Sequence, residues 1–463
     1  MDVPLHYLSL SDVCRRLKSG EFSAVGVTEA MLARIERLEP ALKSYVTVTA
    51  DDALARAAAL DARRANGEPL GALHGVPIAL KDLLWTEGLV TTCGTRVLAD
   101  WVPDEDATVV ARLKAAGAVI LGKVKLTEGA FSNHHPDVEP PVNPWAAERW
   151  TGVSSSGSGV SVAAGLAYGA LGSDTGGSIR FPSACCGLVG IKPTYGRVSR
   201  HGAFPLAESL DHIGPMTRTV EDAARMLGVM AGQDPKDPTS LPAAVPNYVA
   251  ETGGGLAGFA VGVDRDYISA GVAPETVEVV EDALRVLLAA GARVVDVRMP
   301  DCADLVQGWP ITCSVECALA HAATWPSRED EYGPDLARLL KFGQAASATD
   351  YARLERARER FRAELDATFS EVQAIAAPCM ISPPPLTDFG TRVPEEGMAP
   401  FIQFTAPFDY SGHPTITLPV GLDGDGVPRA FQLVGPRLGE AALVRMGSAF
   451  EAAAGFDAHP DID

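Results

Sequence analysis

Apolar residues recur at helical spacing through most of the first seventy residues of the chain. The segment 9–20, SLSDVCRRLKSG, begins with a serine that can cap a helix and ends with a glycine. The segment 22–40 keeps the same spacing, and the Ala-rich segment 51–67 ends in Asn-Gly. We therefore expect residues 1–70 to form an N-terminal helical layer.

After this layer the pattern changes to short apolar strands that alternate with helices. Val76, Ile78 and Leu80 stand at every second position, as in a strand, and Lys81 stands at its end. The alternation continues along the rest of the chain, with helix 106–117, strand 118–124, helix 274–291, strand 292–299, strands 414–421 and 430–436, and a closing helix 439–455.

Strands that are buried on both faces and separated by helices indicate a layered α/β fold. Two segments rich in Ser, Asn, Pro or Gly interrupt the pattern, at 132–160 and at 378–400. Long loops inside a folded domain usually serve a function, and we expect the second segment to form a rim or lid. Because no clear linker is present, we expect residues 1–463 to form a single domain.

The bulk composition excludes several classes of protein. The 463 residues are 47% hydrophobic and 21% charged, which is typical of a globular protein with a large core. A formal net charge of −20 and a pI near 4.9 argue against affinity for nucleic acid or for an anionic membrane surface. No apolar run approaches the ~18 residues that a membrane span needs.

The cysteines and the N-terminal residues favour a cytoplasmic location. The eight cysteines include no C-x-x-C pair and fit no common zinc spacing, so reduced, buried thiols are expected. The first residues, MDVPLHYLSL, have no basic stretch before an apolar run and do not resemble a secretory signal.

Two familiar catalytic patterns are incomplete in this chain. Residues 117–124, GAVILGKV, resemble a phosphate-binding P-loop, but Val124 replaces the Ser or Thr that should hold magnesium, and the intervening residues are typical of a buried strand. No serine has glycine at both −2 and +2, so the nucleophile elbow of a Ser-His-Asp hydrolase is absent. His134 and His135 are candidates for a metal site, which no carboxylate spacing supports, and a loop histidine as general base stays an alternative.

The most suggestive stretch is 151–180, where serines and glycines are concentrated. Residues 174–178 are DTGGS, and paired glycines allow a tight turn whose N–H groups can hold the oxyanion of an acyl-transfer intermediate. Residues 154–157, SSSG, can supply a hydroxyl that relays a proton. Lys81 is the candidate base, although a lone lysine that pairs with Asp82 at the surface, or a Gly/Ser loop, is more often structural.

Together these features resemble the amidase signature family, whose members hydrolyse amides with a Ser–cis-Ser–Lys triad. The resemblance implies the family's fold, a large mixed, mostly parallel central sheet covered by helices on both faces. It extends over nearly the whole chain, through GALHGVPIALKDLL (71–84), 106–128, NPW (143–145), the Gly/Ser run from 152, GSDTGGSIRFPSACCGLVGIKPTYGRVSRHG and the residues after it (172–224), FTAPFDYSGHPTITLPVG (404–421) and AFQLVGP (430–436).

Carried over by position, the resemblance implies the roles of the site residues. Ser178 matches the acylated nucleophile, and Lys81 matches the lysine of the strand-end K-D motif. The bridging serine lies 24 residues before the nucleophile in the family, and 178 − 24 = 154 selects Ser154 rather than Ser155 or Ser156. The remaining residues are the oxyanion-hole donors Thr175, Gly176, Gly177 and Ser178, and the supporting residues Ser155, Asp174 and Arg180.

The loop before the bridging serine departs from the family, which usually has G-G-S-S-G-G where this chain has GVSSSG at 152–157. Valine at 153 removes access to positive φ, which affects the shape of the loop and of the pocket mouth. The segment 131–144 also differs from the commoner family sequences, so its two histidines are expected to face the substrate. Asp174 and Arg180 are expected to fix the nucleophile loop, with direct substrate contact as the alternative.

The implied mechanism requires a neutral lysine. Lowering the pKa of Lys81 from about 10.4 to about 7 is worth roughly 4.6 kcal/mol, which burial has to supply. Ser154 then passes the proton of Ser178 to Lys81, Ser178 attacks the carbonyl carbon, and the proton returns to the leaving nitrogen. Water completes the cycle, and neither a metal nor a cofactor is needed.

The expected substrate is a small neutral or aryl amide, with carbamates and esters as further candidates. The alternative is a glutamine-hydrolysing subunit of a tRNA-dependent amidotransferase, and a third interpretation is a catalytically silent scaffold. The oligomeric state, a homodimer included, stays open. The preference for neutral substrates follows from candidate pocket residues that are all aromatic, namely Phe131, Trp145, Trp150, Phe181, Phe401 and Phe404.

Overall fold

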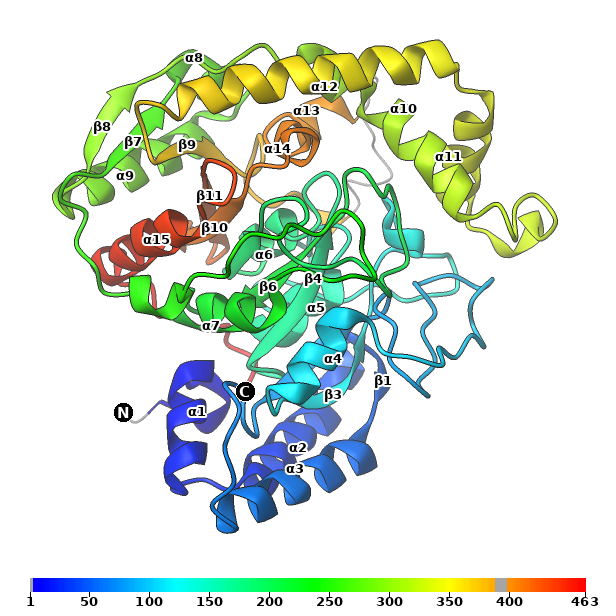
Figure 1. The fold of residues 1–463 in the computed structure, drawn as a ribbon, viewed down its shortest axis with the longest axis vertical. Coiled ribbons are helices and arrows are strands. Elements are labelled where there is room, and N and C mark those ends of the chain that lie inside the picture. The colour runs from blue at the N-terminus through cyan, green and yellow to red at the C-terminus, as the bar shows by residue number, and fades with distance from the viewer. Residues whose placement is uncertain (1–2, 388–397) are drawn as a thin grey trace.

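The computed structural model describes residues 3–387 and 398–463, and its eleven described strands form one sheet (Figure 1). The strand order is β1-β3-β2-β4-β6-β5-β10-β11-β9-β7-β8. The strands are β1 (Tyr45–Val48), β2 (Pro77–Lys81), β3 (Val119–Val124), β4 (Gly169–Asp174), β5 (Val189–Lys192), β6 (His212–Thr217), β7 (Ala260–Val263), β8 (Arg293–Asp296), β9 (Ala374–Pro378), β10 (Thr415–Leu422) and β11 (Pro428–Val434).

The sheet is mixed, as expected, but the expectation that it would be mostly parallel is wrong. Four neighbouring pairs are parallel, β2–β3, β2–β4, β7–β8 and β7–β9. The other six pairs are antiparallel. The tight turn over 423–427 that joins β10 to β11 shows the reason, because a short connection can join only antiparallel neighbours.

Helices cover both faces of the sheet. α5 and α6 pack against each other and against the central strands, whereas α7, α9 and α15 form a second group on the same strands. The helices are α1 (Leu10–Ser19), α2 (Ala24–Leu42), α3 (Ala50–Ala65), α4 (Thr108–Ala115), α5 (Ser156–Ala163), α6 (Arg180–Cys185), α7 (Val220–Met230), α8 (Arg265–Ser269), α9 (Pro274–Ala289), α10 (Ala303–Ala320), α11 (Pro334–Ala345), α12 (Ala348–Thr368), α13 (Ala399–Ile402), α14 (Ala406–Ser411) and α15 (Glu440–Ala454), with 3₁₀ turns η1 (Leu5–Tyr7), η2 (Glu128–Ala130), η3 (Tyr248–Glu251) and η4 (Glu329–Glu331).

The N-terminal helical layer contains the three helices that the sequence indicates, α1 to α3. Ser9 caps α1 by accepting a hydrogen bond from the Asp12 N–H, and Gly20 ends it with φ of 80°. The layer also contains β1, which the sequence analysis missed. β1 pairs antiparallel with β3 and so joins the layer to the sheet.

The two predicted loops differ in how much of them the structure describes. Residues 132–155 contain no helix or strand, and α5 begins at Ser156. Of the segment 378–400, the part 388–397 lies outside the described residues, so the expected rim or lid is not described there. Among the described helices, none has both the length and the apolar composition that crossing a membrane would require.

The parallel neighbours β2 and β4 determine where the polar residues meet. Every residue of both strands is buried, and their carboxyl ends lie at the same edge of the sheet. Lys81 ends β2, Asp174 ends β4, and the glycine-rich turn follows Asp174 directly. Such an edge is a common place for ligand sites in α/β proteins.

Candidate active site

Lys81 is fully buried and points into a group of serine hydroxyls. Its Nζ lies 2.7 Å from Ser154 Oγ, 2.8 Å from Ser155 Oγ and 2.9 Å from Ser173 Oγ. The side chain is 0% exposed, and no carboxylate forms an ion pair with it among the described residues. The alternative pairing of Lys81 with Asp82 at a surface does not occur, because Asp82 lies next to Lys123 instead, at 3.2 Å.

Burial lowers the pKa of Lys81 to about 7, since removing the ammonium from water disfavours its charged form. The negative charges of Asp174 and Asp211 raise the pKa in part but do not cancel this effect. A lysine with this pKa is neutral in a large fraction of molecules near pH 7. The structure therefore provides an amine that can accept a proton at that depth.

The two neighbouring serines differ in their hydrogen bonds. The Ser155 hydroxyl donates to the Ser173 carbonyl oxygen at 3.3 Å, so its proton has an acceptor of its own. Within the described residues, Lys81 is the hydrogen-bond partner of the Ser154 hydroxyl. The Val153–Ser154 peptide bond is cis. The backbone N–H of Ser155 donates to the Ser178 carbonyl oxygen at 3.3 Å, which joins the serine run to the glycine-rich turn.

Asp174 organises the glycine-rich turn from inside. Its Oδ1 accepts from the Gly177 N–H at 2.7 Å, and its Oδ2 accepts from the Ile179 N–H at 2.9 Å. Arg180 Nη2 donates to Asp174 Oδ1 at 2.7 Å and to Asp409 Oδ2 at 2.6 Å. All three charged side chains are fully buried, so this arrangement favours the structural role of Asp174 and Arg180 over direct contact with a substrate.

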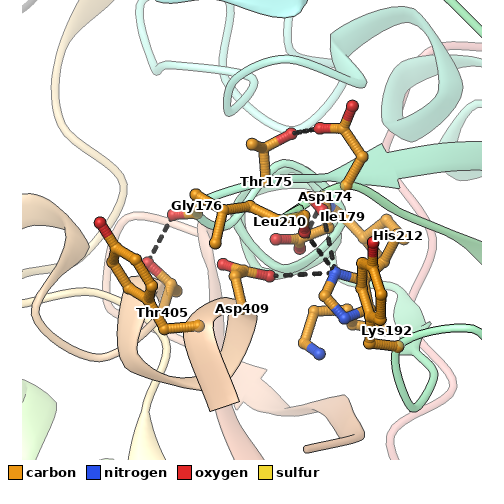
Figure 2. A network of polar contacts seen from close by, with 12 residues as sticks. Asp174, Thr175, Gly176, Ile179, Lys192, Leu210, His212, Thr405 and Asp409 are labelled. Carbon is orange, nitrogen blue, oxygen red and sulfur yellow. Dashed lines mark hydrogen bonds and ion pairs between the residues drawn. The ribbon is translucent and has the colours of Figure 1, made fainter. Parts of the chain in front are cut away.

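The charges of this cluster hold Asp174 ionised. Burial alone raises the pKa of Asp174, but the Arg180 guanidinium and the backbone N–H donors outweigh it and keep the pKa below its ordinary value. The pKa of Asp409 is instead raised by burial. Figure 2 shows this cluster, with His212 Nδ1 2.6 Å from the Leu210 carbonyl oxygen and 3.5 Å from Asp409 Oδ1.

The expected set of four oxyanion donors differs in one member. The Gly177 N–H is engaged by Asp174, because the carboxylate lies inside the turn and draws this N–H inward. The N–H groups of Thr175, Gly176 and Ser178 have no acceptor among the described residues. Gly177 has φ of 128°, and a Cβ there would lie 2.3 Å from the Phe181 ring, so the turn requires glycine at this position.

A cavity of about 100 Å³ lies beside Ser178. The residues that line it within the described ranges carry no charge. Its wall includes Asn133, Leu206, Met398 and Ile402, together with the aromatic side chains of Phe131, Trp150, Phe181, Trp309 and Phe401.

Four of the six aromatic residues expected at the pocket line this cavity, and two do not. The Trp145 indole donates to the Cys186 carbonyl oxygen at 2.9 Å and packs near Phe456. Phe404 is buried against Tyr267, with the ring centroids 5.0 Å apart. The sequence analysis missed Trp309, because α10 is far from every motif and carries no local sign of a site.

The histidine pair and the P-loop-like segment have structural surroundings. His134 Nε2 lies 3.2 Å from Ser156 Oγ, and His135 Nδ1 accepts from the Asp137 N–H at 3.1 Å. Neither histidine lines the cavity, and the described residues contain no cluster of three potential metal ligands. Residues 119–124 form the buried strand β3, which leaves no loop to hold a phosphate.

Comparison with known proteins identifies relatives along nearly the whole chain. Residues 26–444 match the family model described as Amidase. AmiD of Mycobacterium tuberculosis, named as an amidase, is 44% identical over 452 residues, which are 97% of this chain and 94% of AmiD. A glutamyl-tRNA(Gln) amidotransferase subunit of Moorella thermoacetica is 39% identical over 477 residues, which cover 96% of each chain.

A solved structure agrees with this result. The crystal structure of a bacterial aryl acylamidase of the amidase signature enzymes has a TM-score of 0.89 to this chain at 26% identity, with 97% of each chain covered. The protein is thus an enzyme of the class that hydrolyses C–N bonds in linear amides. The chain belongs to the amidase signature family, which confirms the resemblance drawn from its motifs.

Proposed function

We propose that the protein hydrolyses small neutral or aryl amides through an acyl-enzyme on Ser178. Lys81 is the base in this proposal, and Ser154 carries the proton between Ser178 and Lys81. The observation that supports it best is the buried Lys81 amine, with a pKa of about 7, 2.7 Å from Ser154 Oγ. A fully exposed lysine would remain charged at that pH and could not serve as a base.

The proposed reaction has two halves. In the first, Ser154 gives its proton to Lys81 and takes that of Ser178, whose Oγ forms a bond to the carbonyl carbon. The C–N bond then breaks, and the proton returns through Ser154 to the leaving nitrogen. In the second half, water gives up a proton by the same route and attacks the ester, which releases the acid and restores the Ser178 hydroxyl. Ser155 and Ser173 hold the Lys81 amine in place.

The preference for neutral substrates rests on the cavity lining. Phe131, Trp150, Phe181 and Trp309 offer aromatic faces to a flat group, and none of the lining residues within the described part of the chain is charged. An ionised substrate would lose its hydration there without gaining a counter-ion. We therefore place anilides and other uncharged amides first, with carbamates and esters of similar shape after them.

A substrate panel tests this proposal. Hydrolysis of 4-nitroacetanilide, benzamide, phenyl carbamate and phenyl acetate is compared between the wild-type enzyme and Ser178→Ala, with a fluorophosphonate probe as a report on the nucleophile. We expect turnover of the neutral aryl amides and labelling by the probe, both lost in Ser178→Ala. Equal turnover by both enzymes would exclude Ser178 as the nucleophile.

A second candidate function is release of ammonia from glutamine, as in the amidotransferase subunit that is 39% identical to this chain. Free glutamine carries an ammonium and a carboxylate, for which the described cavity wall provides no opposite charge. Glutaminase activity and co-purification with further subunits would support this alternative. Absence of glutaminase activity alongside turnover of the neutral amides would exclude it.

A further inference from the structure

The peptide units of the turn after Asp174 differ in which of their ends are bonded. In a trans peptide unit the C=O and the N–H point in opposite directions, so a hydrogen bond to one end fixes the direction of the other. In the unit between Gly176 and Gly177 both ends are occupied: the Gly176 C=O accepts from Thr405 Oγ1 at 2.6 Å (Figure 2), and the Gly177 N–H donates to Asp174 at 2.7 Å.

The two flanking units are held only at their C=O ends. The Thr175 C=O accepts from Trp309 Nε1 at 2.9 Å, which leaves the Gly176 N–H pointing the opposite way. The Gly177 C=O accepts from the Phe181 N–H at 2.7 Å, which leaves the Ser178 N–H free in the same manner. Neither of these two N–H groups has an acceptor in the described part of the chain.

The cavity lining agrees with this pattern. Gly176 and Ser178 line the cavity, whereas Gly177 is absent from its wall within the described residues. The two free donors therefore face the space where a substrate carbonyl must lie to be attacked by Ser178. Two N–H groups converging on one developing oxyanion are the arrangement that acyl transfer needs.

We propose that Trp309 and Thr405 are positioning residues for the oxyanion hole, in which Gly176 and Ser178 supply the donors. This inference rests on the proposed function. Trp309 fixes the direction of the Gly176 N–H through the Thr175 C=O, and Thr405 prevents the next unit from rotating. The Trp309 ring also covers Gly176, where a Cβ would lie 2.8 Å from its Cζ2 atom, so the indole blocks any movement of the turn on that side.

Trp309 has a second property that makes it more than a structural support. It lines the substrate cavity as well as bonding the turn, and Thr175 and Trp309 are 134 residues apart in the sequence. A substrate group packed against the indole therefore presses on the same side chain that aims the Gly176 donor. The identity of that group should consequently affect kcat, not only KM.

The decisive variant is Trp309→Phe, which keeps an aromatic wall but removes the N–H. We expect kcat for 4-nitroacetanilide to fall about tenfold to a hundredfold, somewhat less than the loss of a whole oxyanion donor, while KM changes less than about threefold. Inhibition by 2,2,2-trifluoroacetophenone supplies a second readout. Ser178 Oγ adds to its carbonyl carbon, the Ser178 proton passes to Lys81, and the carbonyl oxygen becomes the oxyanion. Its Ki should rise in the same proportion as kcat falls.

Two matched comparisons separate positioning from general damage. Trp145→Phe removes an indole bond of the same 2.9 Å length to a backbone carbonyl, away from the cavity, and should leave kcat and Ki within about twofold. Thr405→Val removes the hydroxyl and should lower kcat about tenfold, whereas Thr405→Ser keeps it and should restore most of the rate. Thermal unfolding shows that each variant is folded.

The outcomes are distinct. A folded Trp309→Phe enzyme with kcat and Ki within about twofold of wild type would overturn the role of Trp309, and so would a change confined to KM. If Trp309→Phe does not fold, the Thr405 pair decides, and an equal loss in Thr405→Val and Thr405→Ser overturns the positioning role. Failure of the proposed function looks different, because wild type would then hydrolyse no neutral amide or Ser178→Ala would remain active.

Discussion

The protonation state of Lys81 should control the activity of the enzyme below pH 7. A base acts only when it is unprotonated, so activity should rise with pH through the Lys81 pKa of about 7 and level off above it. The direction is opposite to that of a catalytic acid. The shift from 10.5 to about 7 corresponds to about 5 kcal/mol of lost preference for the ammonium, which burial in the folded protein supplies.

The size of the effect follows from the pKa. With a midpoint near pH 7, about half of the enzyme carries a neutral Lys81 at pH 7 and about 1% at pH 5, so kcat/KM should fall about 50-fold between these two values. Above pH 8 the profile should be flat until a second group titrates.

The assay is kcat/KM for 4-nitroacetanilide from pH 5 to pH 9 at constant ionic strength. Lys81→Ala should be at least about a thousandfold slower at pH 8 and should lack the acid limb. Glu128 is the necessary control, because burial raises the pKa of this carboxyl to about 7 as well. Glu128 accepts from the Gly333 N–H at 2.9 Å and has no contact with Lys81 within the described residues, so Glu128→Gln should retain the limb.

Two results would refute this reasoning. An acid limb that persists with the same midpoint in Lys81→Ala belongs to another group. A limb that disappears in Glu128→Gln while the enzyme stays folded assigns the titration to Glu128. Either result removes the argument that burial of Lys81 creates the base.

Three further predictions follow from the site. Ser154→Ala should lower kcat about a thousandfold and Ser155→Ala only about tenfold, because the Ser155 proton already has a carbonyl acceptor; equal losses in kcat would contradict this. Arg180→Met should lower the free energy of unfolding, measured in guanidinium chloride, by about 3–5 kcal/mol, because two buried carboxylates lose their cation; a loss below about 1 kcal/mol would speak against the buried pair. Gly177→Ala should lower the melting temperature and abolish turnover, since the added Cβ would lie 2.3 Å from the Phe181 ring; normal activity would show that the turn can relax.

The chemical groups of the candidate site were predictable because they lie in short, specific motifs. DTGGS at 174–178 and the serine run at 154–157 are each contiguous, and Lys81 ends a strand that the apolar pattern predicts. The spacing in the sequence does not show that these segments meet. Lys81 and Ser154 are 73 residues apart, and they meet because β2 and β4 are parallel neighbours whose carboxyl ends share one edge of the sheet.

The errors have a common physical cause. The strand directions were misjudged because periodicity predicts a strand but not its neighbour, and β1 was missed because a four-residue strand gives little periodic signal. Gly177 was grouped with the oxyanion donors because the motif does not show where each N–H points. Trp145 and Phe404 were placed at the pocket because an aromatic residue has the same appearance in a sequence whether it packs in the core or lines a cavity.

The sequence by itself determined the family, the order of most helices and strands, and the three side chains proposed for the chemistry, because each of these depends on local pattern or on a contiguous motif. The tertiary structure alone decided the pKa of Lys81, the neutral wall of the cavity and the fixing of the turn by Trp309 and Thr405. These properties arise where distant segments exclude water together: Thr405 and Gly176, for example, are 229 residues apart and share a 2.6 Å hydrogen bond. Burial and hydrogen-bond direction are properties of that shared environment, and no single segment of the chain contains them.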